Sequence, residues 1–182
     1  SSALGMMDEV LIPALEQAGA RYEQGTYFLP QLLLSAEAMQ KAFQVLTPYL
    51  PAGNRSSKGK IVLATVKGDI HDIGKNILAV LLRNYGYQVT DLGKDVPAAA
   101  IVEAARQEEA DVVGLSALMT TTMVQMPGVI EALREANLPC QVIVGGAVIT
   151  PDYAAFAGAD EYAKDAQAAV TAIARLVEAS RR

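Results

Sequence analysis

The chain has 182 residues, a formal net charge of −5, and a composition in which 52% of the residues are hydrophobic. This length suits one domain, or one domain with a small partner, and the negative charge argues against nucleic acid or an anionic membrane as the main partner. The single cysteine excludes an intramolecular disulfide and suits a reducing compartment. No apolar run approaches the roughly 18 residues that cross a bilayer, and the N-terminal residues lack the pattern of a signal peptide. We therefore expect a soluble, cytoplasmic protein.

Residues 1–50 have the pattern of helices. Apolar residues recur at helical spacing in two runs separated by Gly25 and Thr26, and Pro30 suits the first turn of the second run, where its missing N–H costs nothing. The two stripes consist of Leu11, Leu15, Ala18 and Tyr22 in the first run and Leu32, Ala36, Met39, Phe43 and Leu46 in the second. Two helices cannot cover this much apolar surface between them, so we predict that residues 1–50 form an incomplete helical bundle.

Residues 51–59 are rich in Pro, Gly, Asn and Ser and are predicted to form a linker to a second domain, residues 60–182. In that domain apolar strands alternate with helices, which predicts right-handed crossovers and a parallel sheet. The expected strands are 60–66, 88–92, 111–117, 141–145 and 161–164, and the expected helices are 75–85, 97–108, 122–136, 151–157 and 165–180. The fold class is therefore α/β, a five-stranded flavodoxin-like or Rossmann-like sheet of order 2-1-3-4-5.

Three short motifs follow the first, third and fourth predicted strands. They are Asp69-x-His71-x-x-Gly74, Ser116-x-Leu118 and Gly145-Gly146, with 41 residues between the first two motifs and 26 between the last two. These strands are neighbours in a 2-1-3-4-5 sheet, and ligands of such sheets bind at the carboxyl ends of the strands. We therefore expect the three loops to converge on one crevice.

The residue types in these loops suit a metal-bearing ligand. His71, the only histidine of the chain, can give one ring N–H to Asp69 and offer its other nitrogen to a metal. Glycines let a ligand approach the backbone closely, and Ser116 and Thr120–Thr122 add hydroxyl groups. Each residue also has a plain structural interpretation: a hydrogen-bonded core histidine, a serine that caps its own turn, a glycine pair in a tight turn, and a solvated first helical turn at Asp72 and Lys75.

Taken together, the three motifs at these spacings resemble the cobalamin-binding fold of B12 proteins in which a histidine replaces the cofactor's own lower base. Lys67–Ile77 is similar to the corresponding loop of methionine synthase nearly residue for residue. Tyr22-x-x-Gly25-x-x-Phe28-Leu29-Pro30-Gln31-Leu32 resembles the end of the helical cap that precedes this fold in methionine synthase and related corrinoid methyl carriers. The resemblance covers nearly the whole chain.

The resemblance implies a role for each matching residue. His71 is the lower cobalt ligand, and Asp69 and Thr122 complete a hydrogen-bonded relay, although the family has Ser at the position of Thr122. The implied cofactor contacts are Gly68, Asp69, Ile70, His71, Asp72, Gly74, Ser116, Leu118, Thr120, Gly145, Gly146 and Ala166, and the displaced nucleotide tail enters the slot between the three loops. The implied cap residues, which shield the methyl-bearing face, are Tyr22, Phe28, Leu29 and Leu32. Tyr22 replaces a Phe, and only about two helices of the four-helix cap are present.

The implied function is the cobalamin-binding methyl-carrier module of a B12-dependent methyltransferase of the methionine synthase type. It cycles between cob(I)alamin and methylcob(III)alamin, so the expected cofactor is cobalamin, as methylcobalamin with its cobalt. The expected partners are substrate-binding methyltransferase domains or subunits, for the methyl donor and the thiol acceptor, and a reactivation partner, with no nucleic acid or membrane. The chain carries no zinc-thiolate cysteine cluster, so it is predicted to be one module of an enzyme.

Other functions remain open at this point. The nearest alternative is a stand-alone corrinoid protein for methylamine, methanol or O-demethylation. The B12 domain of an adenosylcobalamin mutase normally lacks the cap helix, and B12-sensing regulators place an aromatic residue, often Trp, over the cofactor and carry a DNA-binding domain; this chain contains no Trp. A cofactor-free receiver domain needs a phosphorylatable Asp after the third strand, where Ser116 stands.

Overall fold

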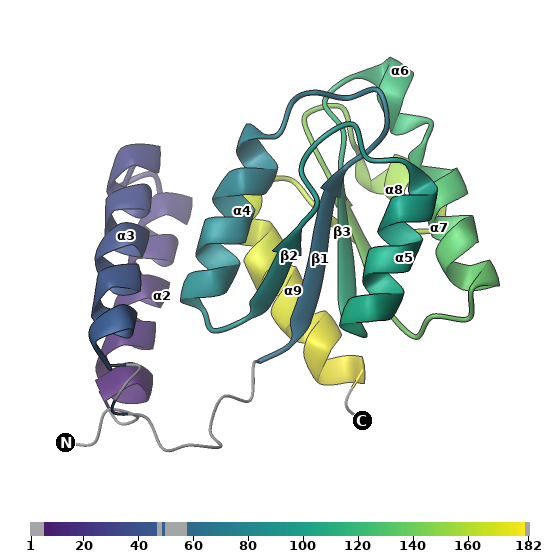
Figure 1. Cartoon of the computed structure of the whole chain (residues 1–182). Coiled ribbons are helices and arrows are strands. Elements are labelled where there is room, and N and C mark those ends of the chain that lie inside the picture. The colour runs from purple at the N-terminus through teal and green to yellow at the C-terminus, as the bar shows by residue number, and fades with distance from the viewer. Residues whose placement is uncertain (1–5, 47–48, 50–57, 181–182) are drawn as a thin grey trace. The chain divides into compact units, whose positions relative to one another are not determined.

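The computed structural model describes residues 6–46, 49 and 58–180, which fall into two compact units, a helical unit and an α/β domain (Figure 1). Each unit is described by itself. All but the last two residues of the predicted 51–59 linker lie outside the described residues. No described helix is both long enough and apolar enough to cross a membrane.

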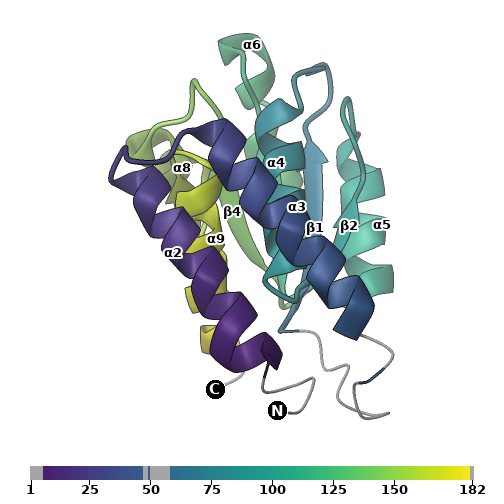
Figure 2. The same ribbon diagram turned by 90° about the vertical axis from the view of Figure 1, so that its left-hand side faces the viewer.

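The helical unit consists of a short π-helix, η1 (Met7–Leu11), followed by α2 (Ile12–Glu23) and α3 (Leu29–Leu46). Helices α2 and α3 lie side by side and are joined by a tight turn (Figure 2). The turn contains Gly25 at φ +73°, and the Thr26 and Tyr27 N–H groups both donate to the Arg21 carbonyl. The predicted apolar stripes meet, because Leu15, Ala18, Leu32, Ala36 and Met39 are buried.

The α/β domain is built on five parallel strands, and their order, β2-β1-β3-β4-β5, confirms the prediction. Continuous apolar runs form the central strands because helices cover both faces of the sheet. The strands are β1 (Lys60–Thr65), β2 (Gln88–Asp91), β3 (Val112–Ser116), β4 (Gln141–Gly145) and β5 (Glu161–Ala163).

Helices α4 and α9 cover one face of the sheet, and α5, α7 and α8 cover the other (Figure 1). The bounds are α4 (Ile73–Asn84), α5 (Ala98–Glu108), α6 (Thr120–Met123), α7 (Met126–Glu135), α8 (Pro151–Ala157) and α9 (Ala166–Ser180). The single helix predicted over 122–136 is wrong, because two helices, α6 and α7, occupy this segment. Pro127 is the reason: it has no N–H, and its ring would clash with the carbonyl of Met123 in a continuous helix.

Candidate functional site

A cavity of about 470 Å³ lies between the sheet and helices α4 and α9, and it reaches the loops that follow β1, β3, β4 and β5. The three motif-bearing loops meet at this cavity. Its lining includes nine of the predicted contact residues: Ile70, His71, Asp72, Gly74, Ser116, Leu118, Gly145, Gly146 and Ala166. Gly68, Asp69, Thr120 and Thr122 do not line it.

Strand register explains why the sheet is hollow here. On β3 and β4, Ser116 is paired with Gly145, and Gly145 is paired with Ala163 on β5, so the last row of the sheet carries small residues. Two residues earlier along the strands, and on the same face, Gly114 stands between Leu63 and Ile143. Leu78 of α4 and Ala169 of α9 close the cavity from the helix side. The result is a slot with mainly apolar walls.

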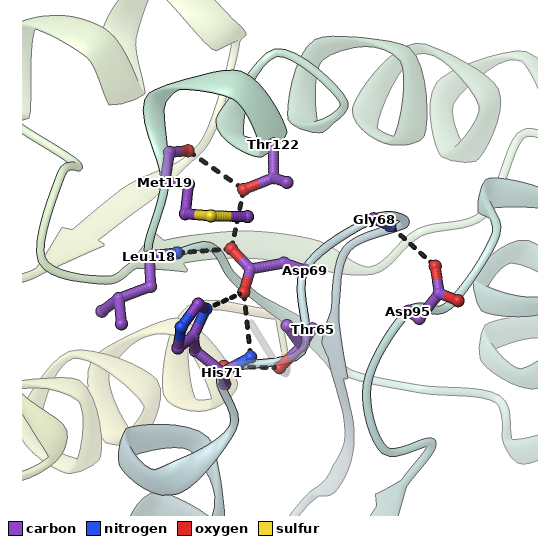
Figure 3. Close-up of polar contacts among 8 residues, drawn as sticks. All are labelled: Thr65, Gly68, Asp69, His71, Asp95, Leu118, Met119 and Thr122. Atoms are coloured by element: carbon purple, nitrogen blue, oxygen red, sulfur yellow. Dashed lines mark hydrogen bonds and ion pairs between the residues drawn. The ribbon is translucent and has the colours of Figure 1, made fainter.

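The carboxylate of Asp69 is the polar centre of the site (Figure 3). Its side chain is fully buried, and each oxygen lies within hydrogen-bonding distance of two donors. Oδ1 accepts from the His71 N–H (2.9 Å) and the His71 ring Nδ1 (2.8 Å). Oδ2 accepts from the Leu118 N–H (2.7 Å) and from Thr122 Oγ1 (2.7 Å). Asp69 thereby connects the loop after β1 with the loop after β3 and with α6.

These donors decide the ionisation of Asp69. Burial on its own raises the pKa of Asp69, but the hydrogen bonds from Thr122, Leu118 and His71 outweigh burial and hold that pKa well below its ordinary value. The carboxylate is therefore ionised at neutral pH and accepts hydrogen bonds only.

His71 receives its orientation from this carboxylate. An ionised acceptor at Nδ1 requires the proton on Nδ1, so the lone pair of the neutral ring lies on Nε2. Nε2 makes no hydrogen bond to any described residue, and the His71 side chain is 44% exposed at the mouth of the cavity. Three exposed apolar side chains are near His71 or Ser116 in the sequence: Ile70 and Leu118 in the loops, and Ile73 at the start of α4.

The hydroxyl groups near the site have different positions. Thr122 is buried on α6 and reaches Asp69, whereas Thr120 begins the same helix, is exposed and makes no contact with Asp69 in the described structure. Ser116 lines the cavity, and its backbone carbonyl accepts from the Val66 N–H (3.1 Å). Only Thr122 can therefore complete a relay with Asp69 and His71.

Protein-family models match both the helical unit and the α/β domain. A family model described as a B12 binding domain matches residues 59–174, and a second B12 binding domain model matches residues 1–47. The chain belongs to the B12-binding family. The cofactor of this B12-binding protein is cobalamin.

Individual relatives agree with this assignment. Dimethylamine corrinoid protein 3 of Methanosarcina mazei is 44% identical over 160 residues, which are 86% of this chain and 96% of that protein. The structure of a cobalamin-binding protein from Desulfitobacterium hafniense DCB-2 matches with a TM-score of 0.78 and 31% identity over 96% of both chains. A chain of the methanol:cobalamin methyltransferase complex from Methanosarcina barkeri matches with a TM-score of 0.85 and 31% identity, over 97% of this chain and 68% of that chain.

The chemistry of the residues around His71 is compatible with cobalamin. The described residues contain no group of three or more His, Cys, Asp or Glu side chains that could hold a bare metal ion. A metal bound by Nε2 of His71 must therefore bring its other ligands with it, as the cobalt of a corrin ring does. The space beside Gly74 supports the same conclusion, because a Cβ added there meets no protein atom within 4 Å and the protein itself does not require a glycine.

Two other glycines have a different explanation from the one predicted. The sequence interpretation assigned Gly145 and Gly146 to close approach of a ligand. A Cβ on Gly146, which has φ +130°, would lie 1.8 Å from the Ala117 carbonyl oxygen, and one on Gly145 would lie 2.9 Å from that of Ala163. Both glycines line the cavity, but the approach of neighbouring backbone already requires them.

Sequence reasoning missed the residues that line the cavity from inside the strands and helices. Their signal is the period of two along each strand, which places Leu63, Gly114, Ile143 and Ala163 on one face. Lys75 was also misinterpreted, because it is not a solvated first-turn residue. Its side chain is only 2% exposed and lines the cavity, and its Nζ contacts Asp91 Oδ1 (2.5 Å) and Asn76 Oδ1 (2.7 Å).

The four predicted cap residues lie in the helical unit and differ in exposure. Leu32 is buried, Tyr22 is half-buried, and Leu29 and Phe28 are 36% and 67% exposed at the start of α3. Phe28 and Leu29 are therefore the members of this set with the most exposed apolar surface.

Proposed function

We propose that this protein is a corrinoid methyl carrier that holds cobalamin through His71 and serves separate methyltransferase subunits acting on methylamines or methanol. The relatives named above are a dimethylamine corrinoid protein and a chain of a methanol:cobalamin methyltransferase complex. They favour the stand-alone corrinoid alternative over the methionine synthase type, and methionine biosynthesis is not supported. The expectation of a methionine synthase module is corrected accordingly.

The observation that carries the proposal is the pair formed by Asp69 and His71. The 2.8 Å contact at Nδ1 leaves Nε2 unbonded among the described residues, at the exposed mouth of an apolar slot. A ligand nitrogen held in this way has one tautomer and one direction.

Each residue of the site has a defined task in this proposal. When bound, cobalamin supplies a cobalt centre that accepts and releases a methyl group. His71 Nε2 would hold the cobalt, Asp69 orients the His71 ring, and the slot beside Gly74, Ser116 and Gly145 would receive the nucleotide tail of the cofactor.

The same geometry gives the protein control over a proton. The lone pair of His71 Nε2 can hold either a metal or a proton, but not both. The ionised Asp69 would stabilise an imidazolium at His71, and Thr122 keeps the carboxylate in place. The His71–Asp69–Thr122 relay would therefore hold one proton at Nε2 when this nitrogen holds no metal.

Isotope labelling tests this ligand directly. Protein labelled with ¹⁵N is loaded with unlabelled cobalamin and reduced to the Co(II) state, and the electron paramagnetic resonance spectrum is recorded. Coordination by His71 changes the nitrogen superhyperfine splitting from a triplet to a doublet on labelling, because the nuclear spin of the ligand nitrogen changes. In His71→Gly the splitting from the protein disappears. A triplet that survives labelling would show that the cofactor's own base is the ligand and would refute the proposal.

The substrate class is tested on the same loaded protein. The cofactor is reduced further, to the Co(I) form. We expect this form to be methylated faster by dimethylamine or methanol with the matching methyltransferase than by methyltetrahydrofolate with a folate-binding partner. A folate rate equal to or above the other two would restore the methionine synthase assignment.

A further inference from the structure

The loop after β2, residues 92–97, runs beside the loop that carries His71, residues 66–72. Val96, near the end of the first loop, and Val66, at the start of the second, form a parallel bridge. The Thr65 N–H donates to the Gly93 carbonyl (2.9 Å), and the Val96 N–H donates to the Thr65 carbonyl (3.0 Å). The 66–72 loop is therefore supported from the side of β2 as well as from β3.

Asp95 makes two contacts with the loop that carries His71, and Figure 3 shows the one with Gly68. Its Oδ1 accepts from the Gly68 N–H (2.7 Å), and its own N–H donates to the Asp69 carbonyl (3.0 Å). One residue thus holds the backbone on both sides of the Gly68–Asp69 peptide. The carboxylate that orients His71 projects from the second of these two residues.

The backbone of Asp95 is itself unusual. It has φ +56°, a left-handed conformation that costs free energy for a residue with a Cβ. The other described non-glycine residues with positive φ, Glu109 and Asn137, come directly after helices α5 and α7, where such a conformation is common. Asp95, by contrast, lies in the loop between β2 and α5 and not at the C-terminal end of a helix. Strained backbone of this kind persists where the surrounding contacts require it, often beside a functional site.

We propose that Asp95 is a positioning residue that fixes the Gly68–Asp69 backbone and thereby aims the Asp69 carboxylate at His71 and Thr122. The inference rests on the proposed function in one respect, that His71 is the cobalt ligand. Asp95 lies outside the cavity lining, so it acts through Asp69 and not by contact with the cofactor.

Three variants distinguish the effect of the Asp95 side chain from the effect of its backbone conformation. Asp95→Gly removes the acceptor of the Gly68 bond and tolerates the positive φ without cost. Asp95→Asn keeps an Oδ1 acceptor and also tolerates this φ. Asn137→Gly is the matched control, because it is the same kind of change at a positive φ after α7. Asp95 is exposed, so all three variants are expected to fold, which circular dichroism checks.

The first readout needs no cofactor. Amide hydrogen exchange of the apoprotein is followed at Gly68, which bonds to Asp95, and at His71 and Leu118, whose N–H groups bond to the Asp69 carboxylate. In Asp95→Gly we expect all three amides to exchange about five- to tenfold faster, while Val113 in the core strand is unchanged. Asp95→Asn and Asn137→Gly should match the parent protein. Faster exchange at Gly68 alone would refute the inference, because the effect would not reach Asp69.

The second readout uses the ¹⁵N-labelled, cobalamin-loaded protein. We expect the fraction of Co(II) with a protein nitrogen ligand to fall at least twofold in Asp95→Gly and to stay at the parental value in Asp95→Asn and Asn137→Gly. If the parent protein itself shows no protein nitrogen ligand, the proposed function fails. If the parent shows this ligand and Asp95→Gly retains it fully, or if Asp95→Asn loses it equally, only the role of Asp95 is overturned.

Discussion

Asp69 shows how a single buried charge can be stabilised and used. A carboxylate without exposure to water is costly unless hydrogen bonds replace its hydration, and here two donors come from the backbone and two from side chains. Because every donor is fixed by the fold, the carboxylate has one orientation, and the imidazole bonded to it has one tautomer. The precision of the site is therefore a property of Asp69 more than of the exposed His71.

Removing the hydroxyl group of Thr122 tests how much one of these hydrogen bonds to Asp69 contributes. Thr122→Val keeps the shape of the side chain but removes the hydroxyl that lies 2.7 Å from Asp69 Oδ2. We expect a loss of about 2 kcal/mol in the free energy of unfolding of the apoprotein, the usual value for a hydrogen bond to a charged group.

The control for Thr122 is a serine. Thr122→Ser keeps the hydroxyl and removes only the methyl group, so the loss should be below about 1 kcal/mol. Urea denaturation of the three proteins measures both values. An equal loss in the Val and Ser variants would mean that the methyl group, not the hydrogen bond, stabilises this position.

At the scale of elements, the sequence was a good guide to the strands and their order and a poor one to which individual residues stand opposite one another. The strands and their order followed from apolar runs that alternate with helices, and the motifs marked the loops correctly. The break at Pro127 was missed because apolar periodicity runs across it. The hollow formed by Gly114, Gly145 and Ala163 depends on which strand residues stand opposite one another. Likewise, the bonds of Asp95 join loops that only the sheet order brings together.

The same substitution at two glycines separates the demands of the fold from those of the ligand. Gly146→Ala places a Cβ 1.8 Å from the Ala117 carbonyl oxygen at φ +130°, so we expect the apoprotein to lose about 2 kcal/mol or more. Gly74→Ala adds a Cβ in open space within α4, so we expect apoprotein stability to change by less than about 1 kcal/mol, in the stabilising direction.

Gly74→Ala, which should hardly affect the stability of the apoprotein, should weaken cofactor binding. Gly74→Ala narrows the cavity, so we expect cobalamin affinity to fall about tenfold, a cost of about 1.4 kcal/mol. Denaturation of the apoprotein and titration with hydroxocobalamin measure the two effects separately. An unstable Gly74→Ala apoprotein would show that the protein itself requires this glycine. A variant that binds as tightly as the parent would show that the ligand does not require it.

At the scale of the whole molecule, the sheet order turns separate loops into one site. Strands β1, β3 and β4 are neighbours, so the residues that follow them meet, although 41 and 26 residues separate their motifs along the chain. Asp69 connects the loops after β1 and β3 by hydrogen bonds, and its ionised form accepts all four of them. The stability of the α/β domain should therefore depend on acid in a way that traces to this one group.

The sign of the acid effect follows from the direction of the shift. The pKa of Asp69 is lower in the folded protein than its ordinary value of 3.8, so its stabilisation is complete above about pH 5 and is lost as the pH falls below 3.8 toward the folded value.

Asp69→Asn tests this dependence. The variant places an amide NH₂ group, itself a donor, opposite donors that now bond to the carboxylate, so it should cost about 3 kcal/mol in the free energy of unfolding at pH 7. The difference between parent and variant should shrink below pH 3.8 by up to about 1.4 kcal/mol per pH unit. Urea denaturation of the apoproteins from pH 7 to pH 3 measures it, with Asp152→Asn, an exposed position on α8, as the control. A difference that is constant over this range would mean that the hydrogen bonds to Asp69 do not depend on its charge.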